Sequence, residues 1–183
     1  MNKTAIILAE GFEEVEGLTA VDLLRRAGIV CDMLSLDDAP VVVGSHGIEV
    51  RADLGFSAAD FDSYDGVILP GGLKGTRRLS EDARVIELLQ RFHAAGKLTA
   101  AICAGPTVLG QAGILQGLRA VCYPGVEDRL TGATTGTEAA VTDGTVITSR
   151  GMGTSVPFGL AIVRYFQGEE AAEALARKVV WQN

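Results

Sequence analysis

The chain has 183 residues, of which 48% are hydrophobic and 21% charged, so it can bury a complete core as a single domain spanning residues 1–183. Its net charge of −7 disfavours nucleic acids and anionic membranes as partners, because both reward clustered lysine and arginine. No segment combines the charged start, apolar core and cleavage site of a signal peptide, so we expect a cytoplasmic protein.

The first half of the chain alternates apolar runs with amphipathic segments. Buried strands are predicted at three apolar runs, residues 4–9, 29–36 and 66–69. Apolar residues at helical spacing predict a helix over residues 18–27, and Gly28 ends it as a C-terminal cap. The segments 41–43 and 48–51 predict a hairpin through a glycine-containing loop.

The second half continues this alternation. A polar loop containing Lys74 is expected before a helix over residues 81–95, with Ser80 as its N-cap. Further strands are expected at the apolar run ending at Cys103, at residues 119–123, and in a hairpin of residues 139–142 and 146–149. Closing helices are expected at residues 157–166 and 170–179. The alternation predicts an α/β sandwich, with a mainly parallel sheet covered by helices on both faces.

The most informative segment is residues 98–107, where an apolar strand ends at Cys103 and a helix begins within three residues. Ala101 and Gly105 flank the cysteine with the small-residue spacing of a nucleophile elbow. Pro106 suits the first helical position because it has no N–H to leave unpaired. A thiol there faces the positive end of a helix and free amides, which favour the thiolate. The alternative is a small buried cysteine that fills a gap in the core.

Four carboxylates follow the first strand, close to a helix start: Glu10, Glu13, Glu14 and Glu16. In one interpretation they stay solvated and stabilise the helix dipole. In the other, one of them turns inward beside the thiol, where burial and like charge raise its pKa and keep it protonated. It would then donate a hydrogen bond to sulfur, although composition does not choose among the four.

Two glycines follow the strand at residues 66–69. Gly71 and Gly72 either form a simple turn or offer their amides, with that of Ala104, to an oxyanion. His46 lies in the predicted hairpin loop and His93 is predicted to be a surface residue of a helix. A cysteine–histidine–acid triad therefore has no evident base.

The remaining cysteines, Cys31 and Cys122, are predicted to be core residues in strand interiors. The three cysteines lack the paired CxxC spacing of a zinc site, so we expect free thiols and no metal.

Five segments, in this order, resemble the DJ-1/ThiJ/PfpI superfamily and its DJ-1/ThiJ branch in particular. They are AEGFEEVE (9–16), DLLRRAGI (22–29), YDGVILPGG (64–72), AAICAGPTVL (100–109) and TSRGMGTS (148–155). The resemblance implies a flavodoxin-like three-layer sandwich in which Cys103 is the reactive cysteine of the elbow. It also implies that Glu16 is the acid hydrogen-bonded to the sulfur, and that Gly71 and Gly72 line the site.

One departure from the family concerns the residue near the cysteine where many members carry a histidine. The corresponding position here is Tyr123, and a neutral tyrosine is a poor base at pH 7. His46 is a candidate substitute, because its loop approaches the partner's site in relatives. The resemblance further implies a homodimer, with residues 22–28 in the interface.

The resemblance implies a cofactor-free enzyme of glyoxalase or deglycase type that converts methylglyoxal or glyoxal to a hydroxy acid. In that reaction Cys103 adds to the aldehyde and Glu16 moves protons. The alternative function is an oxidative-stress sensor or a chaperone-like protective protein with an oxidisable Cys103.

Overall fold

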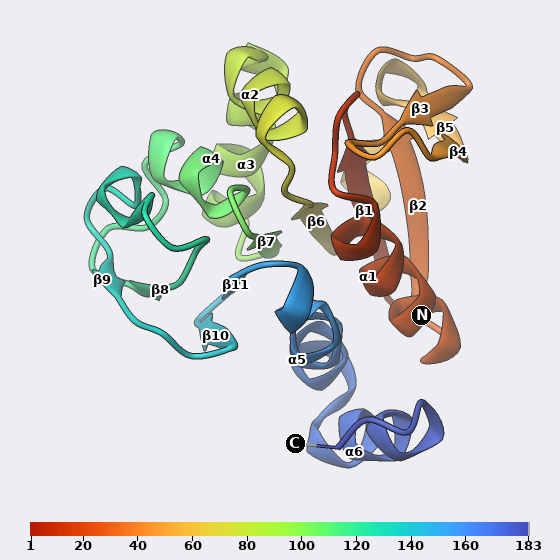
Figure 1. The fold of residues 1–183 in the computed structure, drawn as a ribbon, viewed down its shortest axis with the longest axis vertical. Coiled ribbons are helices and arrows are strands. Elements are labelled where there is room, and N and C mark those ends of the chain that lie inside the picture. The colour runs from red at the N-terminus through yellow and green to blue at the C-terminus, as the bar shows by residue number, and fades with distance from the viewer. Residues whose placement is uncertain (183) are drawn as a thin grey trace.

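The computed structural model describes residues 1–182, which form an α/β sandwich around one large sheet (Figure 1). Within this part of the chain the sheet has the strand order β10-β11-β7-β6-β1-β2-β5. All neighbouring strands are parallel except β10, which runs antiparallel to β11. The strands are β1 (Lys3–Leu8), β2 (Val30–Ser35), β5 (Leu54–Gly55), β6 (Gly66–Leu69), β7 (Leu98–Ile102), β10 (Ala140–Asp143) and β11 (Val146–Ser149).

Two strand pairs lie outside the main sheet. The predicted hairpin is confirmed as β3 (Val41–Val43) antiparallel to β4 (Glu49–Arg51), and β8 (Arg119–Ala120) pairs with β9 (Thr134–Thr135). Short 3-10 turns occupy Phe56–Ala58, Phe61–Ser63, Glu127–Arg129 and Met152–Thr154.

Helices cover both faces of the sheet (Figure 1). One face carries α1 (Glu14–Arg26), α5 (Ser155–Gln167) and α6 (Glu169–Lys178). The other carries α2 (Leu73–Glu81), α3 (Ala83–Ala94) and α4 (Pro106–Gln111). Among residues 1–182, no helix combines the length and the apolar character that crossing a membrane requires.

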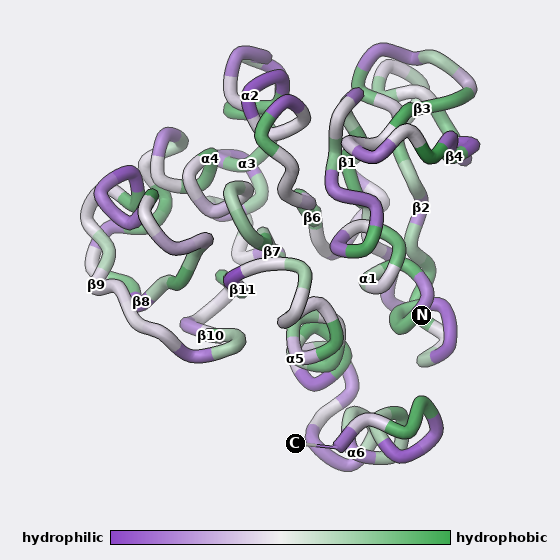
Figure 2. Tube along the Cα trace, viewed as in Figure 1, coloured by the Kyte–Doolittle hydropathy of each residue, from purple (hydrophilic) through white to green (hydrophobic). Residues whose placement is uncertain are grey.

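The alternation of side chains along β1 explains the two cores. Ala5 and Ile7 pack into the core with α3 and α4, whereas Ile6 and Leu8 pack into the core with α1 and α5. A strand buried on both faces needs apolar residues at every position, which is why its sequence is a continuous apolar run. Figure 2 shows α5 as largely hydrophobic, in agreement with its buried stretch of residues 158–163.

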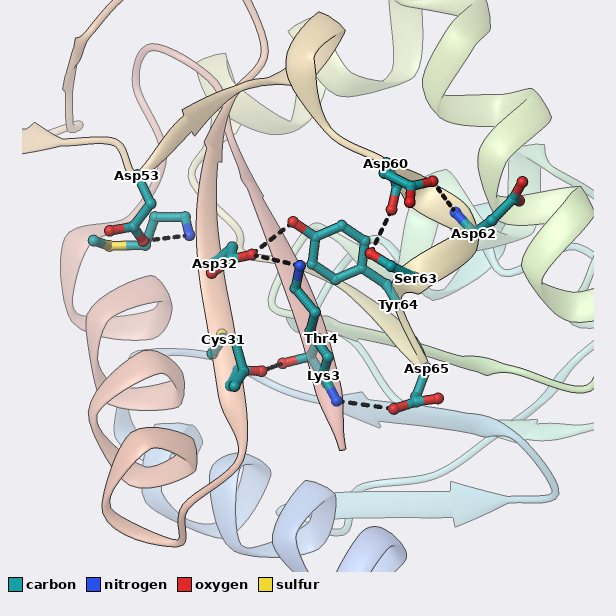
Figure 3. Close-up of polar contacts among 12 residues, drawn as sticks. Lys3, Thr4, Cys31, Asp32, Asp53, Asp60, Asp62, Ser63, Tyr64 and Asp65 are labelled. Carbon is teal, nitrogen blue, oxygen red and sulfur yellow. Dashed lines mark hydrogen bonds and ion pairs between the residues drawn. The ribbon is translucent and has the colours of Figure 1, made fainter. Parts of the chain in front are cut away.

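A polar cluster fastens the amino ends of β1, β2 and the segment before β6 (Figure 3). The buried Tyr64 donates its hydroxyl proton to Asp32 Oδ2 over 2.7 Å. Lys3 Nζ lies 3.3 Å from the same carboxylate oxygen, and the Lys3 backbone N–H donates to Asp65. These side chains join three segments of the sheet on the side away from its carboxyl edge, where ligands of such sheets bind.

The segment after β6 is a correction to the sequence prediction. The expected loop at Lys74 is the helix α2, and Ser80 lies within it rather than capping the next helix. The N-cap of α3 is Asp82, whose side chain accepts from the Arg84 N–H over 2.9 Å.

Three smaller corrections concern other elements. The helix α1 begins at Glu14, four residues before the predicted start at Leu18. Cys122 is buried as expected but follows the short strand β8 rather than lying inside a strand. His93 is half-buried, not fully exposed.

Candidate active site around Cys103

The candidate site lies at the carboxyl ends of four strands that are neighbours in the sheet, β11, β7, β6 and β1. Cys103 directly follows β7, and Gly71 and Gly72 follow β6. Glu16 comes from the first turn of α1, and Gly151 from the segment after β11. Parallel strands bring these separate segments to one edge, where ligands of open α/β sheets bind.

The backbone of Cys103 is strained, as the elbow predicts. Its φ of 65° lies in the left-handed region. For an L-residue with a Cβ, this conformation costs about 1–2 kcal/mol of conformational free energy. Two hydrogen bonds hold it there: its N–H donates to the Ser149 carbonyl over 3.0 Å, and its carbonyl accepts from the Tyr123 N–H over 2.8 Å. A Cβ at Gly105 would lie 3.0 Å from the Leu69 carbonyl oxygen, so the turn requires a glycine there.

The inward-turning carboxylate is Glu16, as the family resemblance implies. Its side chain is 1% exposed and its carboxyl group hydrogen-bonds with the Cys103 thiol. The Gly71 N–H donates to Glu16 Oε2 over 2.9 Å, which orients the carboxyl group. A Cβ at Gly71 would overlap that carboxylate and lie 2.9 Å from Cys103 Sγ, so only glycine fits. The Gly71 amide therefore serves Glu16, and the amides of Gly72 and Ala104 hydrogen-bond with the sulfur.

Cys103 and Glu16 affect each other's ionisation in opposite directions. Burial raises the pKa of Glu16 to about 7, although its hydrogen bond with the Cys103 thiol acts to lower that pKa. Burial, followed by the charge and hydrogen bond of Glu16, raises the pKa of the Cys103 thiol to about 12, although the amides of Gly72 and Ala104 act in the opposite direction. The helix end and amides thus do not by themselves produce the predicted low-pKa thiolate. The thiolate is favoured only when Glu16 holds the proton that the pair shares.

The other three glutamates have different partners. Glu10 forms an ion pair with Lys74 on α2. Glu13 accepts from the Ser45 hydroxyl over 3.0 Å. Burial opposes the charge of Glu14, but hydrogen bonds from backbone amides and from His46 and Ser45 outweigh it and lower its pKa to about 2.

An open cavity of about 630 Å³ lies over Cys103. The polar residues that line it, here called the polar wall, include Glu10, Glu13, Ser45, His46 and Lys74. The apolar residues that line it, here called the apolar wall, include Leu73, Tyr123, Val126 and Met152. The structure therefore brings His46 and Tyr123 of the same chain into the cavity of Cys103, with Glu16, Gly72 and Ala104 at its base.

Comparison with known proteins shows that residues 2–165 match the model of the DJ-1/PfpI family. The chain belongs to the DJ-1/PfpI family. It is 41% identical over 185 residues to the Parkinson disease protein 7 homolog of Danio rerio, covering 99% of this chain and 98% of that protein. The structure of oxidised DJ-1 from Toxoplasma gondii covers 100% of both chains with a TM-score of 0.95 and 33% identity. A deglycase of Pyrococcus abyssi is 33% identical over 131 residues, 72% of this chain and 78% of that protein.

This similarity confirms the flavodoxin-like α/β sandwich for this DJ-1/PfpI protein. Sequence reasoning missed two contributions to its site. Ser149 contributes only its carbonyl oxygen, which leaves no side-chain signal in the sequence. The sequence shows four similar glutamates, so it does not identify Glu14 as the one beneath the hairpin loop. Only the structure shows that the loop folds over Glu14 and that the His46 N–H donates to it.

One group of side chains in this DJ-1/PfpI protein has the composition of a metal site. Glu13, Glu14 and His46 each offer one ligand atom, and these atoms lie within 4.8 Å of one another. The Glu14 oxygens, however, already accept hydrogen bonds from the His46 N–H and the Ser45 hydroxyl. The cluster is thus satisfied by the protein's own donors.

Proposed function

We propose that this protein is a cysteine-dependent, cofactor-free enzyme that converts methylglyoxal or glyoxal to the corresponding hydroxy acid. The observation that carries the proposal is the Cys103–Glu16 pair at the base of an open cavity, where a nucleophile and an acid share one proton. The similarity to a deglycase from Pyrococcus abyssi supports an enzyme of this kind.

The reaction begins when the Cys103 thiolate adds to the aldehyde carbon. Protonated Glu16 gives its proton to the carbonyl oxygen, which forms a hemithioacetal. The amides of Gly72 and Ala104 stabilise the negative charge that develops on that oxygen. The apolar wall of the cavity accommodates the methyl group of methylglyoxal.

Glu16, now a carboxylate, removes the proton from the carbon bonded to sulfur and returns it to the neighbouring carbon. The product is a thioester of the hydroxy acid, which water hydrolyses to release the free thiol. One carbon is oxidised while its neighbour is reduced, so the reaction needs no external oxidant or reductant.

Lactate formation from methylglyoxal by the purified protein tests this proposal. Cys103→Ser is expected to lose activity, and Glu16→Gln to lose about 100-fold or more, the usual contribution of a general acid–base group. Cys122→Ala is the matched control, because this buried thiol lies outside the cavity. Lactate formation that survives Cys103→Ser would contradict the proposal.

A second candidate function is oxidative-stress sensing, and the accessibility of the three thiols favours it. Cys103 is half-buried and lines the open cavity, whereas Cys31 and Cys122 are buried and less accessible to peroxide. Peroxide is therefore expected to oxidise Cys103 first, and protonated Glu16 can donate to a sulfinate oxygen. Negligible lactate formation before oxidation, with altered stability or partner binding after it, would favour the sensor.

A further inference from the structure

The carboxylate of Glu14 is buried beneath the hairpin loop that joins β3 to β4. Its residue is 2% exposed, yet the carboxylate accepts from the His46 N–H over 2.7 Å and the Ile48 N–H over 3.4 Å. It also accepts from the Ser45 hydroxyl over 3.1 Å, and His46 Nδ1 lies 3.2 Å away. These donors keep Glu14 charged in spite of its burial.

The loop is shaped around this carboxylate. A Cβ at Gly44 would overlap the Glu14 carboxyl group, so the loop closes over it only with glycine at that position. Backbone hydrogen bonds fasten the loop on both sides: Gly11 N–H donates to the Val43 carbonyl and Ser45 N–H to the Phe12 carbonyl, each over 2.8 Å. The backbone of His46 is therefore held firmly at the edge of the cavity.

The imidazole of His46 is oriented by the same carboxylate. Nδ1 faces Glu14 Oε2 at 3.2 Å and Glu13 Oε2 at 3.5 Å, which leaves Nε2 as the nitrogen available to a ligand. The side chain is 71% exposed and lines the cavity that contains Cys103. The hydrogen bond that the ring of His46 donates to Glu14, and then the charges of Glu13 and Glu14, raise the pKa of His46 above its ordinary value of 6.5.

We propose that His46, positioned by Glu14, contacts the second oxygen of a 1,2-dicarbonyl ligand bound to Cys103 and protonates it as the enediol forms. This inference rests on the proposed function and adds a catalytic residue, His46, and a positioning residue, Glu14. A dicarbonyl presents oxygens on two adjacent carbons, and the amides of Gly72 and Ala104, which act on the sulfur, are placed for the oxygen on the carbon that Cys103 attacks.

The proton transfers balance without another reactant. When Glu16 removes the proton from the carbon bonded to sulfur, the electron pair forms a carbon–carbon double bond. The π pair of the second carbonyl moves onto its oxygen, which takes the Nε2 proton of His46. Glu16 then protonates the second carbon, the first hydroxyl releases its proton to solvent, and the exposed imidazole regains one from solvent.

The remaining charged groups of the cavity do not compete for this role. Lys74 on α2 is paired with Glu10 across the loop after β1, and Glu16 faces Cys103. Glu13 and Glu14, both beside His46, favour its protonated form. His46 is thus the cation of the polar wall that is free to give a proton to a ligand.

The pH dependence of methylglyoxal turnover tests the inference. Wild-type kcat is expected to fall at high pH as His46 loses its proton. His46→Gln should lower kcat about 100-fold, leave KM within about threefold, and abolish the high-pH fall. Glu14→Gln should move that fall to lower pH, because it removes the charge that raises the pKa of His46. The control His93→Gln, at a position on α3, should leave the profile unchanged.

Two further measurements separate this inference from the proposed function. His46→Gln should leave the rate of Cys103 alkylation by iodoacetamide unchanged, because Glu16 controls the thiol. In the His93→Gln background, His46 is the sole histidine, and its NMR signal should shift when methylglyoxal forms an adduct with Cys103 but not with Cys103→Ser. Turnover with an unchanged pH profile in His46→Gln would overturn the inference alone. A shifted signal without turnover would overturn the proposed reaction and leave the His46 contact standing.

Discussion

Cys103 occupies a backbone conformation that glycine adopts without strain, so its two smallest replacements should differ in stability. At a φ of 65°, an alanine would still carry the steric cost of the left-handed region, about 1–2 kcal/mol of folding stability. A glycine would avoid that cost but would lose more conformational entropy on folding, which costs about 0.5–1 kcal/mol. We expect Cys103→Gly to exceed Cys103→Ala in free energy of unfolding by up to about 1 kcal/mol, as measured in urea. Ala27→Gly, at a φ of −78°, should instead lose stability. If the alanine variant were the more stable, Cys103 would be unstrained.

The charge of Glu16 predicts how the Cys103 thiol responds to pH. Glu16 loses its proton near its pKa of about 7, and above that pH its charge and hydrogen bond raise the pKa of the thiol. In Glu16→Gln only burial remains to raise the pKa of the thiol above its ordinary value of 9.0, so this pKa should fall below the wild-type value of about 12. The midpoint of iodoacetamide alkylation should therefore move to lower pH.

Glu10→Gln is the control for that measurement, because Glu10 is paired with Lys74 and not with the sulfur. An unchanged or raised midpoint in Glu16→Gln would show that the charge of this carboxyl group does not act on the thiol.

The candidate site could be predicted only in part from individual residues. Small residues on both sides of Cys103 identified the elbow, because the turn physically excludes larger side chains. Glu16 could not be chosen from four glutamates by composition, since its burial depends on Gly71, which lies 55 residues away along the chain. The thiolate prediction considered the helix end and amides, but burial and the Glu16 charge are larger effects on the pKa.

The helix α1 carries two buried glutamates whose effects on stability have opposite signs. The folded-state pKa of Glu16 is raised from 4.5 to about 7, so the folded chain binds more protons and stability falls as pH rises through that window. The shift corresponds to about 3 kcal/mol. Glu16→Gln should therefore raise the free energy of unfolding by up to that amount at pH 8, and have little effect near pH 4.5.

The folded-state pKa of Glu14 is lowered from 4.5 to about 2, so its stabilisation is present above pH 4.5 and is lost as pH falls towards 2. Glu14→Gln should lower the free energy of unfolding at pH 7 by up to about 3 kcal/mol. The free energies of unfolding of Glu16→Gln and Glu14→Gln, measured in urea at several pH values, check both predictions. Effects of equal sign at pH 8 would contradict these assignments.

Element prediction succeeded where the hydrophobic pattern was strong. The runs that became β1, β6 and β7 are mostly apolar because both faces of the sheet are covered, and their threonines, Thr4 and Thr99, are buried as well. The helix α2 was missed because only Gly75, Thr76 and Leu79 of its residues are buried, and glycine and threonine favour helices weakly. Its basic residues therefore resembled a solvated loop.

At the scale of the whole molecule, an apolar groove of about 730 Å³ borders α1 and the C-terminal segment. Val15 and Ile48, both about half exposed, line it together with Asp22 and Arg26 of the predicted interface. We propose that a second copy of the chain covers this groove, as the family resemblance implies. Sedimentation should then give twice the chain mass of 19.1 kDa.

Val15→Glu should shift this assembly to the monomer, because it buries an unpaired charge in the interface. Leu54→Glu is the matched control, since Leu54 is exposed to a similar degree but lies outside the groove. A wild-type monomer at micromolar concentration would exclude the dimer.

The two backbone hydrogen bonds that hold Cys103 in its strained conformation have a consequence for biosynthesis. Its carbonyl partner belongs to Ser149, so a growing polypeptide contains the cysteine well before it contains the residue that completes the elbow. The ribosome adds about 5–20 residues per second, and the intervening stretch takes several seconds to make. During that interval Cys103 is an ordinary thiol, without the strained turn of the finished protein. We therefore expect the elbow to be completed only after β11 has been made and has inserted beside β7.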